Sequence, residues 1–306
     1  MLVACTEDEP WEKEDRSNVN SNAALVSQTR EMSVTESTST DCQQVAMRME
    51  IPRLQCGVND LFVVHTVGGT VNYCMEYDCS LRANRWTAYQ WYKGMSSKET
   101  KWDRGKWKKG ETFNGYGGRS DPFQPDPIIP SQYQTTLADH ANNGYDRGHM
   151  LGSADRLNSK EANGQTFYLS NMHPQLANFN QHGIWYNLEN RLRSEYDKDS
   201  FRDTLYVVKG GTIAQGQYAK GKNNLPVPKY FFMAILCKNS DKAQNGYKAI
   251  AFWMEHKASN DANYAQYAIS IDELENRTGI DFFCNLPDEI EQQVESNLVL
   301  SAWGLK

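Results

Sequence analysis

The chain has 306 residues, 39% of them hydrophobic and 23% charged, which is typical of a folded protein with a substantial core. No run of about eighteen apolar residues occurs, so the sequence offers no candidate transmembrane helix. Residues 1–50 hold ten of the 38 acidic and four of the 32 basic side chains, so the excess of acidic residues lies there and the rest of the chain is neutral overall. The net charge of −6 therefore does not exclude a nucleic-acid partner.

The N-terminus carries a candidate export signal. Residues 2–5 read Leu-Val-Ala-Cys and resemble a bacterial lipobox, in which the cysteine becomes the lipidated first residue of the mature protein. The positively charged start and apolar h-region of a secretory signal are missing. The sequence predicts a protein exported from a bacterial cell, either periplasmic, secreted, or anchored in the outer membrane as a lipoprotein through Cys5. The alternative is a tail with no targeting role.

A polar segment follows the candidate lipobox. Residues 6–45 are rich in Ser, Thr, Asn and acidic residues and show no sustained helical or strand period. Such a segment cannot bury enough apolar surface to fold by itself. We therefore expect residues 1–45 to be a flexible tail and residues 46–306 to form a single domain.

The remaining cysteines bear on the redox compartment. They are Cys42, Cys56, Cys74, Cys79, Cys237 and Cys284. In an oxidising compartment they could form up to three disulfides, whose pairing the sequence leaves open. The spacing of Cys74 and Cys79 is not that of a zinc knuckle, and no matching histidine pair accompanies it. The cysteines therefore favour some disulfides over a structural metal.

The segments after residue 50 predict a domain with more strands than helices. Seven segments are rich in Val, Ile, Tyr, Phe and Thr and are bounded by Gly, Asn, Asp or Pro, which is typical of strands. They are residues 60–67, 71–78, 85–93, 166–171, 203–213, 229–237 and 248–256. Apolar residues recur at helical spacing in residues 181–199, and further helices are expected at 269–279, capped by Ser270, and at 287–299.

The order of these segments indicates the fold class. Strands and helices do not alternate strictly, so we expect an α+β fold whose central sheet is mostly antiparallel and flanked by helices. Residues 94–145 differ from the rest because they are rich in Gly and Pro and have little periodicity. Long ordered loops of this kind are often functional.

One part of this loop is strongly basic. Residues 98–110, KETKWDRGKWKKG, hold six basic and two acidic side chains with two interleaved tryptophans. Lysines that bind phosphates and indoles that stack on bases would suit sequence-tolerant nucleic-acid binding. The alternative is a solvated surface loop with its aromatics packed inward. The candidate nucleic-acid contacts are Lys101, Trp102, Lys106, Trp107, Lys108 and Lys109.

Four short motifs lie within about forty residues of one another. They are DRGH at 146–149, SNMHPQ at 170–175, NFNQ at 178–181 and WYNLE at 185–189. In this order and spacing they resemble the DNA/RNA non-specific endonuclease family, whose active site is of the ββα-metal or His-Me finger type. RWTAYQW upstream and RSDPFQPDP at 119–127 extend the resemblance to roughly residues 55–260.

The chemistry of phosphodiester hydrolysis agrees with these residue types. The reaction needs an activated water, a cation near the scissile phosphate and help for the leaving oxygen. A neutral imidazole such as His149 can take a proton from water. Mg²⁺ prefers oxygen ligands and keeps several waters, so the amide oxygen of Asn180 could suffice beside the phosphate. Guanidinium groups such as those of Arg147 and Arg119 bind phosphate oxygens in pairs of hydrogen bonds.

The resemblance implies a role for each matching residue. His149 matches the general base and Asn180 the metal ligand, while Arg147 and Arg119 match phosphate-contacting arginines. Asn171 matches an active-site asparagine, and Glu189 matches a glutamate that supports the hydrated metal. The implied enzyme uses Mg²⁺, with Mn²⁺ or another divalent ion as an alternative, and cuts DNA and RNA to leave 5′-phosphate ends.

The sequence departs from the family pattern at two places. The proline that usually follows DRGH is replaced by Gly152, and Asn180 and Trp185 are five residues apart where the family has four. One extra residue rotates a helix by about 100°, which could move Glu189 away from the site unless the insertion is absorbed near Gly183. Two alternatives follow: a catalytically impaired nucleic-acid-binding surface protein of the same fold, or a phosphodiesterase that acts on smaller phosphate esters in a closed pocket.

Overall fold

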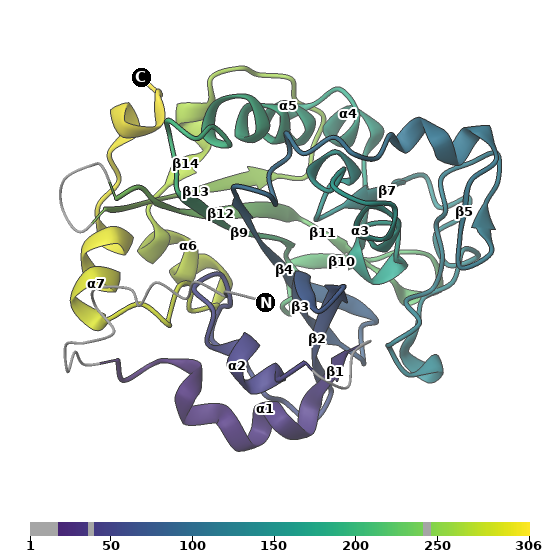
Figure 1. Ribbon diagram of the computed structural model, residues 1–306, viewed down its shortest axis with the longest axis horizontal. Helices are drawn as coiled ribbons and strands as arrows, with labels where there is room; N and C mark the ends of the chain where they lie inside the picture. The colour runs from purple at the N-terminus through teal and green to yellow at the C-terminus, as the bar shows by residue number, and fades with distance from the viewer. Residues whose placement is uncertain (1–17, 36–39, 241–245) are drawn as a thin grey trace, which may run out of the picture.

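The computed structural model describes residues 18–35, 40–240 and 246–306 and is built around one large sheet (Figure 1). Eight strands form this sheet in the order β1-β2-β3-β4-β9-β12-β13-β14. All neighbouring strands pair antiparallel except β1 and β2, which are parallel. The strands are β1 (Ser33–Thr35), β2 (Asp60–Val67), β3 (Thr70–Asp78), β4 (Ala83–Tyr92), β9 (Thr204–Gly211), β12 (Tyr230–Lys238), β13 (Tyr247–Glu255) and β14 (Ala268–Ile269). The expected α+β class with a mostly antiparallel sheet is confirmed.

The sheet separates two hydrophobic clusters, and β12 contributes to both. Phe231, Met233 and Ile235 belong to the cluster on one face, whereas Phe232 and Ala234 belong to the cluster on the other. This alternation follows the two-residue period of a strand. Because both faces are covered, the central strands are continuous apolar runs rather than polar-apolar alternations.

Helices cover both faces of the sheet (Figure 1). The first face carries α4 (Ala177–Asn180) and α5 (Ile184–Arg191), and Trp185 and Leu188 of α5 pack in its cluster. The opposite face carries α2, α6 and α7. These three helices are α2 (Cys42–Ala46), α6 (Ile271–Thr278) and α7 (Asp288–Ser296). Another short helix, α3 (Lys160–Gln165), follows β7 in the chain. Ser270 caps α6 as expected, because its side chain accepts a hydrogen bond from the Glu273 N–H.

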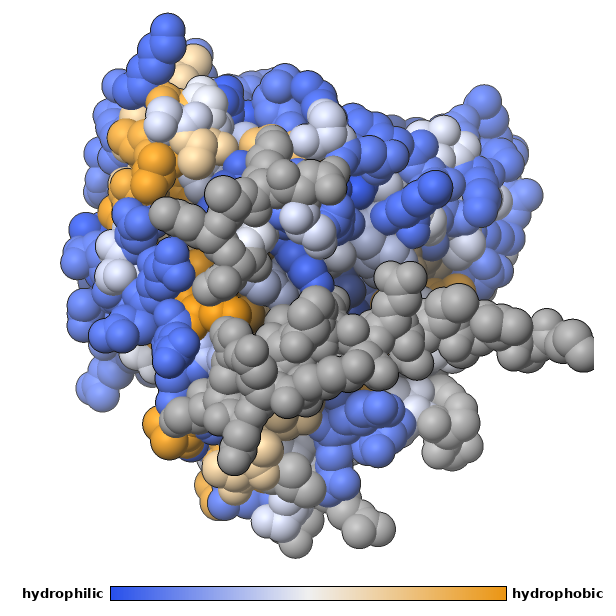
Figure 2. All heavy atoms as spheres, turned by 60° about the vertical axis from the view of Figure 1, so that its left-hand side comes forward, coloured by the Kyte–Doolittle hydropathy of each residue, from blue (hydrophilic) through white to orange (hydrophobic). Residues whose placement is uncertain are grey.

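Three small two-stranded sheets lie outside the main sheet. One of them pairs β7 with β8 and contains the DRGH motif. Their strands are β5 (Thr112–Phe113), β6 (Tyr116–Gly117), β7 (Asp146–His149), β8 (Met172–Gln175), β10 (Tyr218–Lys220) and β11 (Pro226–Pro228). On the side of the molecule that Figure 2 brings forward, most of the visible described surface is hydrophilic, with hydrophobic atoms gathered in a few patches.

Six of the seven predicted strands agree with the structure to within about two residues, and one prediction was wrong. Residues 166–171 form a turn and a short 3-10 helix, Leu169–Asn171, and the strand β8 begins only afterwards. The predicted helix at 181–199 is also interrupted. Its regular part is α5, and one wide turn, Leu192–Tyr196, follows in π-helical geometry.

The expectation of a flexible tail up to residue 45 needs correction. Residues 22–25 form a 3-10 turn, α1 (Val26–Met32) and β1 follow, and α2 begins at Cys42. β1 pairs with β2 and thereby extends the main sheet, so sheet pairing supplies the order that the polar composition did not indicate. Cys5 and the candidate lipobox lie outside the described residues. Within the described residues, no helix has the length and apolar character needed to cross a membrane.

The expected disulfides are absent from the described part of the chain. All six of its cysteines are free thiols. Cys237 packs in the hydrophobic cluster on one face of the sheet and Cys74 in the cluster on the other, so the sheet itself separates them. Cys79, five residues after Cys74 in the chain, lies with Cys237 on the opposite side of the sheet from Cys74.

We therefore predict that reductant does not change the thermal stability of the protein. The melting temperature should be the same with and without dithiothreitol, because no cross-link among these six cysteines restricts the unfolded chain. Titration of thiols in denaturant should find at least these six. A fall in melting temperature on reduction, or a smaller thiol count, would contradict the structure.

Candidate active site

The DRGH motif forms the first strand of a hairpin that precedes two short helices. β7 pairs antiparallel with β8, and α4 and α5 follow directly, which gives the β-β-α order that the resemblance implies. Gly148 lies against Gln175, and a Cβ at this glycine would stand 2.2 Å from the Gln175 side chain. A larger residue would have to displace the fully buried Gln175 side chain, so this position favours glycine.

The turn after His149 is held by Asn171. The Asn171 side chain accepts a hydrogen bond from the Leu151 N–H and donates to the carbonyls of Leu151 and Thr166, all at 2.9 Å. The Met150 N–H donates to the Asn171 carbonyl at 3.0 Å. Asn171 is fully buried and is not among the residues that line the pocket around His149. In this structure it therefore positions the histidine and does not face the space where substrate would bind.

The His149 imidazole lines this pocket and carries an unpaired nitrogen. Its Nε2 atom is buried and has no hydrogen-bond partner among the described residues. The ring packs against Phe123 and Phe167, with centroid distances of 5.6 and 5.3 Å. Burial, together with the cations of Arg104 and Arg147, lowers the pKa of His149 to about 3. His149 is thus neutral near pH 7 and can accept a proton.

Asn180 ends helix α4 and lines the same pocket. Its Nδ2 donates to the Asp146 carboxylate at 3.1 Å, and Gln181 Nε2 donates to the same carboxylate oxygen at 2.8 Å. With the amide nitrogen engaged, the Oδ1 atom is left without a donor among the described residues. An amide oxygen suits a hard divalent cation, which needs few protein ligands when waters and a phosphate complete its shell. The donor set at Asn180 fits such a cation.

The one-residue insertion is absorbed between the two helices. α4 ends at Asn180, and α5 begins after Gly183. A Cβ on Gly183 would lie 2.0 Å from the Asn178 carbonyl oxygen, so this tight connection requires glycine. Glu189 consequently lines the pocket together with Asn180. Of the two outcomes that the sequence left open, absorption near Gly183 is the one observed.

Glu189 belongs to a buried ionic network. It accepts a hydrogen bond from Lys209 Nζ of β9 at 2.9 Å, and this Nζ lies 3.5 Å from the Asp155 carboxylate. Asp155 in turn accepts a hydrogen bond from Arg193 at 2.6 Å. Burial lowers the pKa of Lys209, but the carboxylates of Glu189 and Asp155 outweigh it and raise that pKa above its usual value. The network joins the central sheet, α5 and the loop after β7, and it fixes the position of Glu189.

Three arginines line the pocket. Arg147 lies over the Phe123 ring with its guanidinium carbon 4.1 Å from the centroid, and no described residue accepts a hydrogen bond from it. Arg104 has a 44% exposed side chain, and Arg193 a 15% exposed one. Arg119 is exposed on the loop after β6 and is not among the lining residues. The structure thus places Arg147 in the pocket, as the sequence predicted, and adds Arg104 and Arg193, whereas the predicted Arg119 lies outside the lining.

The pocket is polar and accessible from outside. Its volume is about 470 Å³, and exposed side chains such as Gln181, His182 and Tyr186 stand at its edge. His182 lines it, whereas His173 is buried on β8 with its Nε2 3.1 Å from the Asn84 carbonyl. An accessible pocket suits a phosphate within a polymer better than a small enclosed ester.

The basic segment near residue 100 is only partly available for binding. Lys101, Lys106, Lys108 and Lys109 are exposed. Trp102 is half-buried, and Lys106 lies over its ring at 4.7 Å. The prediction was wrong for Trp107. This tryptophan is fully buried and donates to Asn163 Oδ1 at 2.7 Å, so it has no free face for a base.

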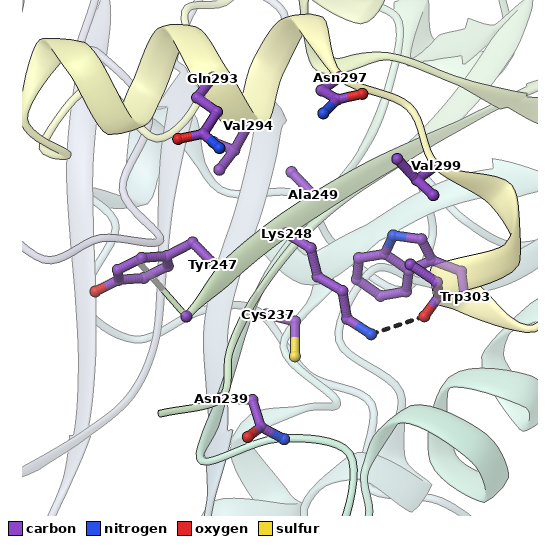
Figure 3. Close-up of a pocket in the computed structure, with 12 residues that line it drawn as sticks. Cys237, Asn239, Tyr247, Lys248, Ala249, Gln293, Val294, Asn297, Val299 and Trp303 are labelled. Atoms are coloured by element: carbon purple, nitrogen blue, oxygen red, sulfur yellow. Dashed lines mark hydrogen bonds between the residues drawn. The ribbon is translucent and has the colours of Figure 1, made fainter. Parts of the chain in front are cut away.

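A second pocket lies between β12, β13 and the C-terminal segment (Figure 3). Its volume is about 370 Å³. Lys248 points across it and donates to the Ala302 carbonyl at 2.7 Å, while Cys237 contributes a fully buried thiol. It contains no histidine, carboxylate or arginine among its lining residues, so it lacks the acid-base groups found around His149.

Comparison with known proteins agrees with the geometry around His149. Residues 65–289 match the family model described as DNA/RNA non-specific endonuclease. The chain belongs to this family. It is therefore an endonuclease, a non-specific hydrolase of DNA and RNA.

Individual relatives support this assignment. A nuclease of Nostoc sp. is 30% identical over 196 residues, which cover 63% of this chain and 70% of the relative. Nuclease C1 of Cunninghamella echinulata is 33% identical over 58% of this chain and 71% of the relative. Human mitochondrial endonuclease G is 31% identical over 58% of this chain and 61% of the relative. A crystal structure of an EndoG/EndoGI complex shares the fold with a TM-score of 0.59 and 23% identity, covering 73% of this chain and 86% of that chain.

Two parts of the site were not assigned from the sequence. Arg104 lies in the basic segment and Arg193 in the predicted helix 181–199, but neither was predicted to be a site residue, and Lys209 lies in a segment with the pattern of an ordinary strand. A charged residue in an otherwise apolar strand, LYVVKGG, is a signal that could have marked Lys209, because a buried lysine needs a carboxylate partner.

We predict that Gly183→Ala lowers both stability and activity. The added methyl group would clash with the Asn178 carbonyl and force Asn180 and Glu189 apart, at a cost of about 1–3 kcal/mol in the free energy of unfolding. Denaturant unfolding and plasmid degradation measure the two effects. Asn178→Ala, which changes an exposed side chain of α4 and leaves the backbone carbonyl in place, should leave both near the wild-type values. An unaffected Gly183→Ala enzyme would show that the tight connection is not needed.

Proposed function

We propose that this endonuclease hydrolyses phosphodiester bonds with His149 as the general base and with a divalent cation, Mg²⁺ by preference, held by Asn180. One observation carries the proposal. The buried, unpartnered Nε2 of His149 shares a pocket with the free amide oxygen of Asn180 and with three arginines. A base, an oxygen ligand and phosphate-binding cations are the three components that this reaction requires.

The proton transfers follow from the state of the imidazole. A water molecule attacks the phosphorus atom while its proton passes to the neutral His149 ring. The bond from phosphorus to the 3′-oxygen breaks, and this oxygen takes a proton from solvent. The products are a 5′-phosphate and a 3′-hydroxyl. His149 then releases its proton readily, because burial and the nearby arginines lower its pKa.

The cations of the pocket would stabilise the negative charge of the phosphate. When bound, a divalent ion at Asn180 would stabilise negative charge on the phosphate and the leaving oxygen. Arg147 is available for two parallel hydrogen bonds to phosphate because its guanidinium makes none to the described residues. Glu189, held by Lys209 at 2.9 Å, would accept hydrogen bonds from water around the ion.

Substrate contacts beyond the pocket are assigned to the exposed lysines of the basic segment. Lys101, Lys106, Lys108 and Lys109 could bind phosphates along a strand of either DNA or RNA, since phosphates are common to both. Two observations count against the alternatives. The accessible pocket does not match the closed site of a small-ester phosphodiesterase, and Glu189 has not left the pocket as an impaired enzyme would require.

We also propose export to the bacterial cell envelope through Cys5. This rests on the lipobox-like residues 2–5 and the acidic polar segment that follows them. Metabolic labelling with a fatty acid, compared between the native chain and Cys5→Ala, measures lipidation directly. Label on the native chain alone supports the anchor, and an unlabelled native chain rejects it.

His149→Ala should reduce the rate of plasmid and RNA degradation by about 100- to 10,000-fold, the usual contribution of a general base. His182→Ala serves as a matched control, because it removes an imidazole from the edge of the same pocket but not the proposed base. Rates should be measured with Mg²⁺ and with a chelator. If both histidine variants retain activity in Mg²⁺, His149 is not the base.

The pH dependence of kcat/KM tests the environment of His149. The base is active when neutral, and its pKa is lowered to about 3, so the active form persists as the pH falls well below the usual histidine value of about 6.5. We expect no acid limb near pH 6.5 at saturating Mg²⁺. Arg104→Met removes a cation and should move any acid limb to higher pH. An acid limb at pH 6.5 in the wild type would contradict the buried environment.

A further inference from the structure

A cluster of carboxylates lies between α6 and α7. Carboxylate oxygens of Asp272, Glu275 and Glu295 lie within 4.8 Å of one another. Asp272 is exposed, Glu275 is half-buried and Glu295 is 7% exposed. They are the one group of three or more His, Cys, Asp or Glu residues among the described residues whose ligand atoms lie this close together.

One buried oxygen of this cluster and one beside the neighbouring acids have no donor. Glu295 Oε1 is buried without a hydrogen-bond partner, although its side chain is more than nine-tenths buried. Asn20 Oδ1 is also buried and unpartnered. The Asn20 Nδ2 atom donates to Asp281 at 3.2 Å and to Glu291 at 2.9 Å, two further acids whose charges act on Glu295. A buried oxygen without a donor costs free energy that a bound cation would recover.

Like charges surround Glu295. Burial, together with the carboxylates of Glu275, Glu291 and Asp281, raises the pKa of Glu295 to about 10. Burial likewise raises the pKa of Glu275 to about 8. Burial raises the pKa of the neighbouring Asp281, and the positive charge of Arg53 opposes this rise. The Arg53 guanidinium donates hydrogen bonds to the carbonyls of Asn20 and Ser21, however, and not to a carboxylate.

We propose that Asp272, Glu275 and Glu295 bind a Ca²⁺ ion that stabilises the packing of α6 against α7. Ca²⁺ accepts six to eight oxygen ligands in flexible geometry, and water can occupy the coordination positions that the protein does not fill. A site of three carboxylates, of which one is exposed and one is buried, suits this ion. Mg²⁺ requires stricter octahedral geometry and dehydrates reluctantly, so it should bind here more weakly.

This site is separate from the nuclease pocket. Ile271 and Leu274 of α6 and Ile290 and Val294 of α7 pack in the hydrophobic cluster on one face of the sheet, whereas α5 packs on the other. The ion would therefore act on stability and not on hydrolysis. Through Asn20, which bonds Asp281 and Glu291, it would also favour the docked position of the N-terminal segment.

The test uses the full chain with Asn180→Ala, which removes the proposed ion ligand of the nuclease pocket. Chelator-treated protein is titrated with CaCl₂ by calorimetry, and its melting temperature is followed in parallel. We expect one Ca²⁺ to bind and the melting temperature to rise. Asp272→Asn, an exposed change that should not disturb folding, should weaken binding by at least about tenfold. Glu295→Gln should abolish binding and raise the melting temperature of the ion-free protein, because it removes a repelled acid.

Glu289→Gln is the matched control, since Glu289 is an exposed glutamate of the same helix outside the cluster. It should bind Ca²⁺ like the parent. In the chain with native Asn180, Glu295→Gln should degrade plasmid at the wild-type rate in saturating Mg²⁺, so this site and the nuclease pocket are tested independently. No heat and no shift in melting temperature with CaCl₂, or equal affinities in Asp272→Asn, Glu295→Gln and Glu289→Gln, would overturn the proposal.

Discussion

The pairing of Lys209 with Glu189 and Asp155 is the constraint on which the nuclease pocket depends. Lys209 is fully buried in the central strand β9, where an unpaired charge would be strongly unfavourable. Its two carboxylate partners come from α5 and from the loop after β7, and Asp155 also binds Arg193. The need to neutralise one buried ammonium group thus brings three separate segments together, and it does so beside the unpartnered nitrogen of His149.

Around this network, each backbone segment presents one chemical group. The Asn171 side chain holds the turn that follows His149, and Asp146 orients the Asn180 amide through its nitrogen. Phe123 packs against both the His149 ring and the Arg147 guanidinium, which excludes water from one side of each. A neutral base, a free amide oxygen and unpaired guanidinium donors are therefore prepared before substrate arrives, as electrostatic stabilisation of a phosphate requires.

The sequence predicted the parts of this structure that local patterns determine. Long apolar strands such as residues 230–238 and the cap at Ser270 follow from side-chain periodicity and hydrogen-bonding capacity. The DRGH, NFNQ and WYNLE motifs indicated His149, Asn180 and Glu189. The sequence did not reveal which tryptophan of the basic segment is buried, nor that β1 adds to the sheet, because tertiary contacts decide both. Arg104 and Arg119 illustrate the same limit: both are basic residues of one long loop, and only the folded chain shows which of them lines the pocket.

The most direct test of this account is to locate the catalytic ion. Crystals of His149→Ala with a short DNA duplex can be soaked in Mn²⁺, and anomalous scattering then marks each bound ion. The account predicts a peak in the pocket, in contact with Asn180 Oδ1 and a phosphate oxygen of the DNA, with Glu189 facing the waters around the ion. A duplex bound with its phosphate at Arg147 but with no ion against Asn180, or an ion held by other residues, would contradict it.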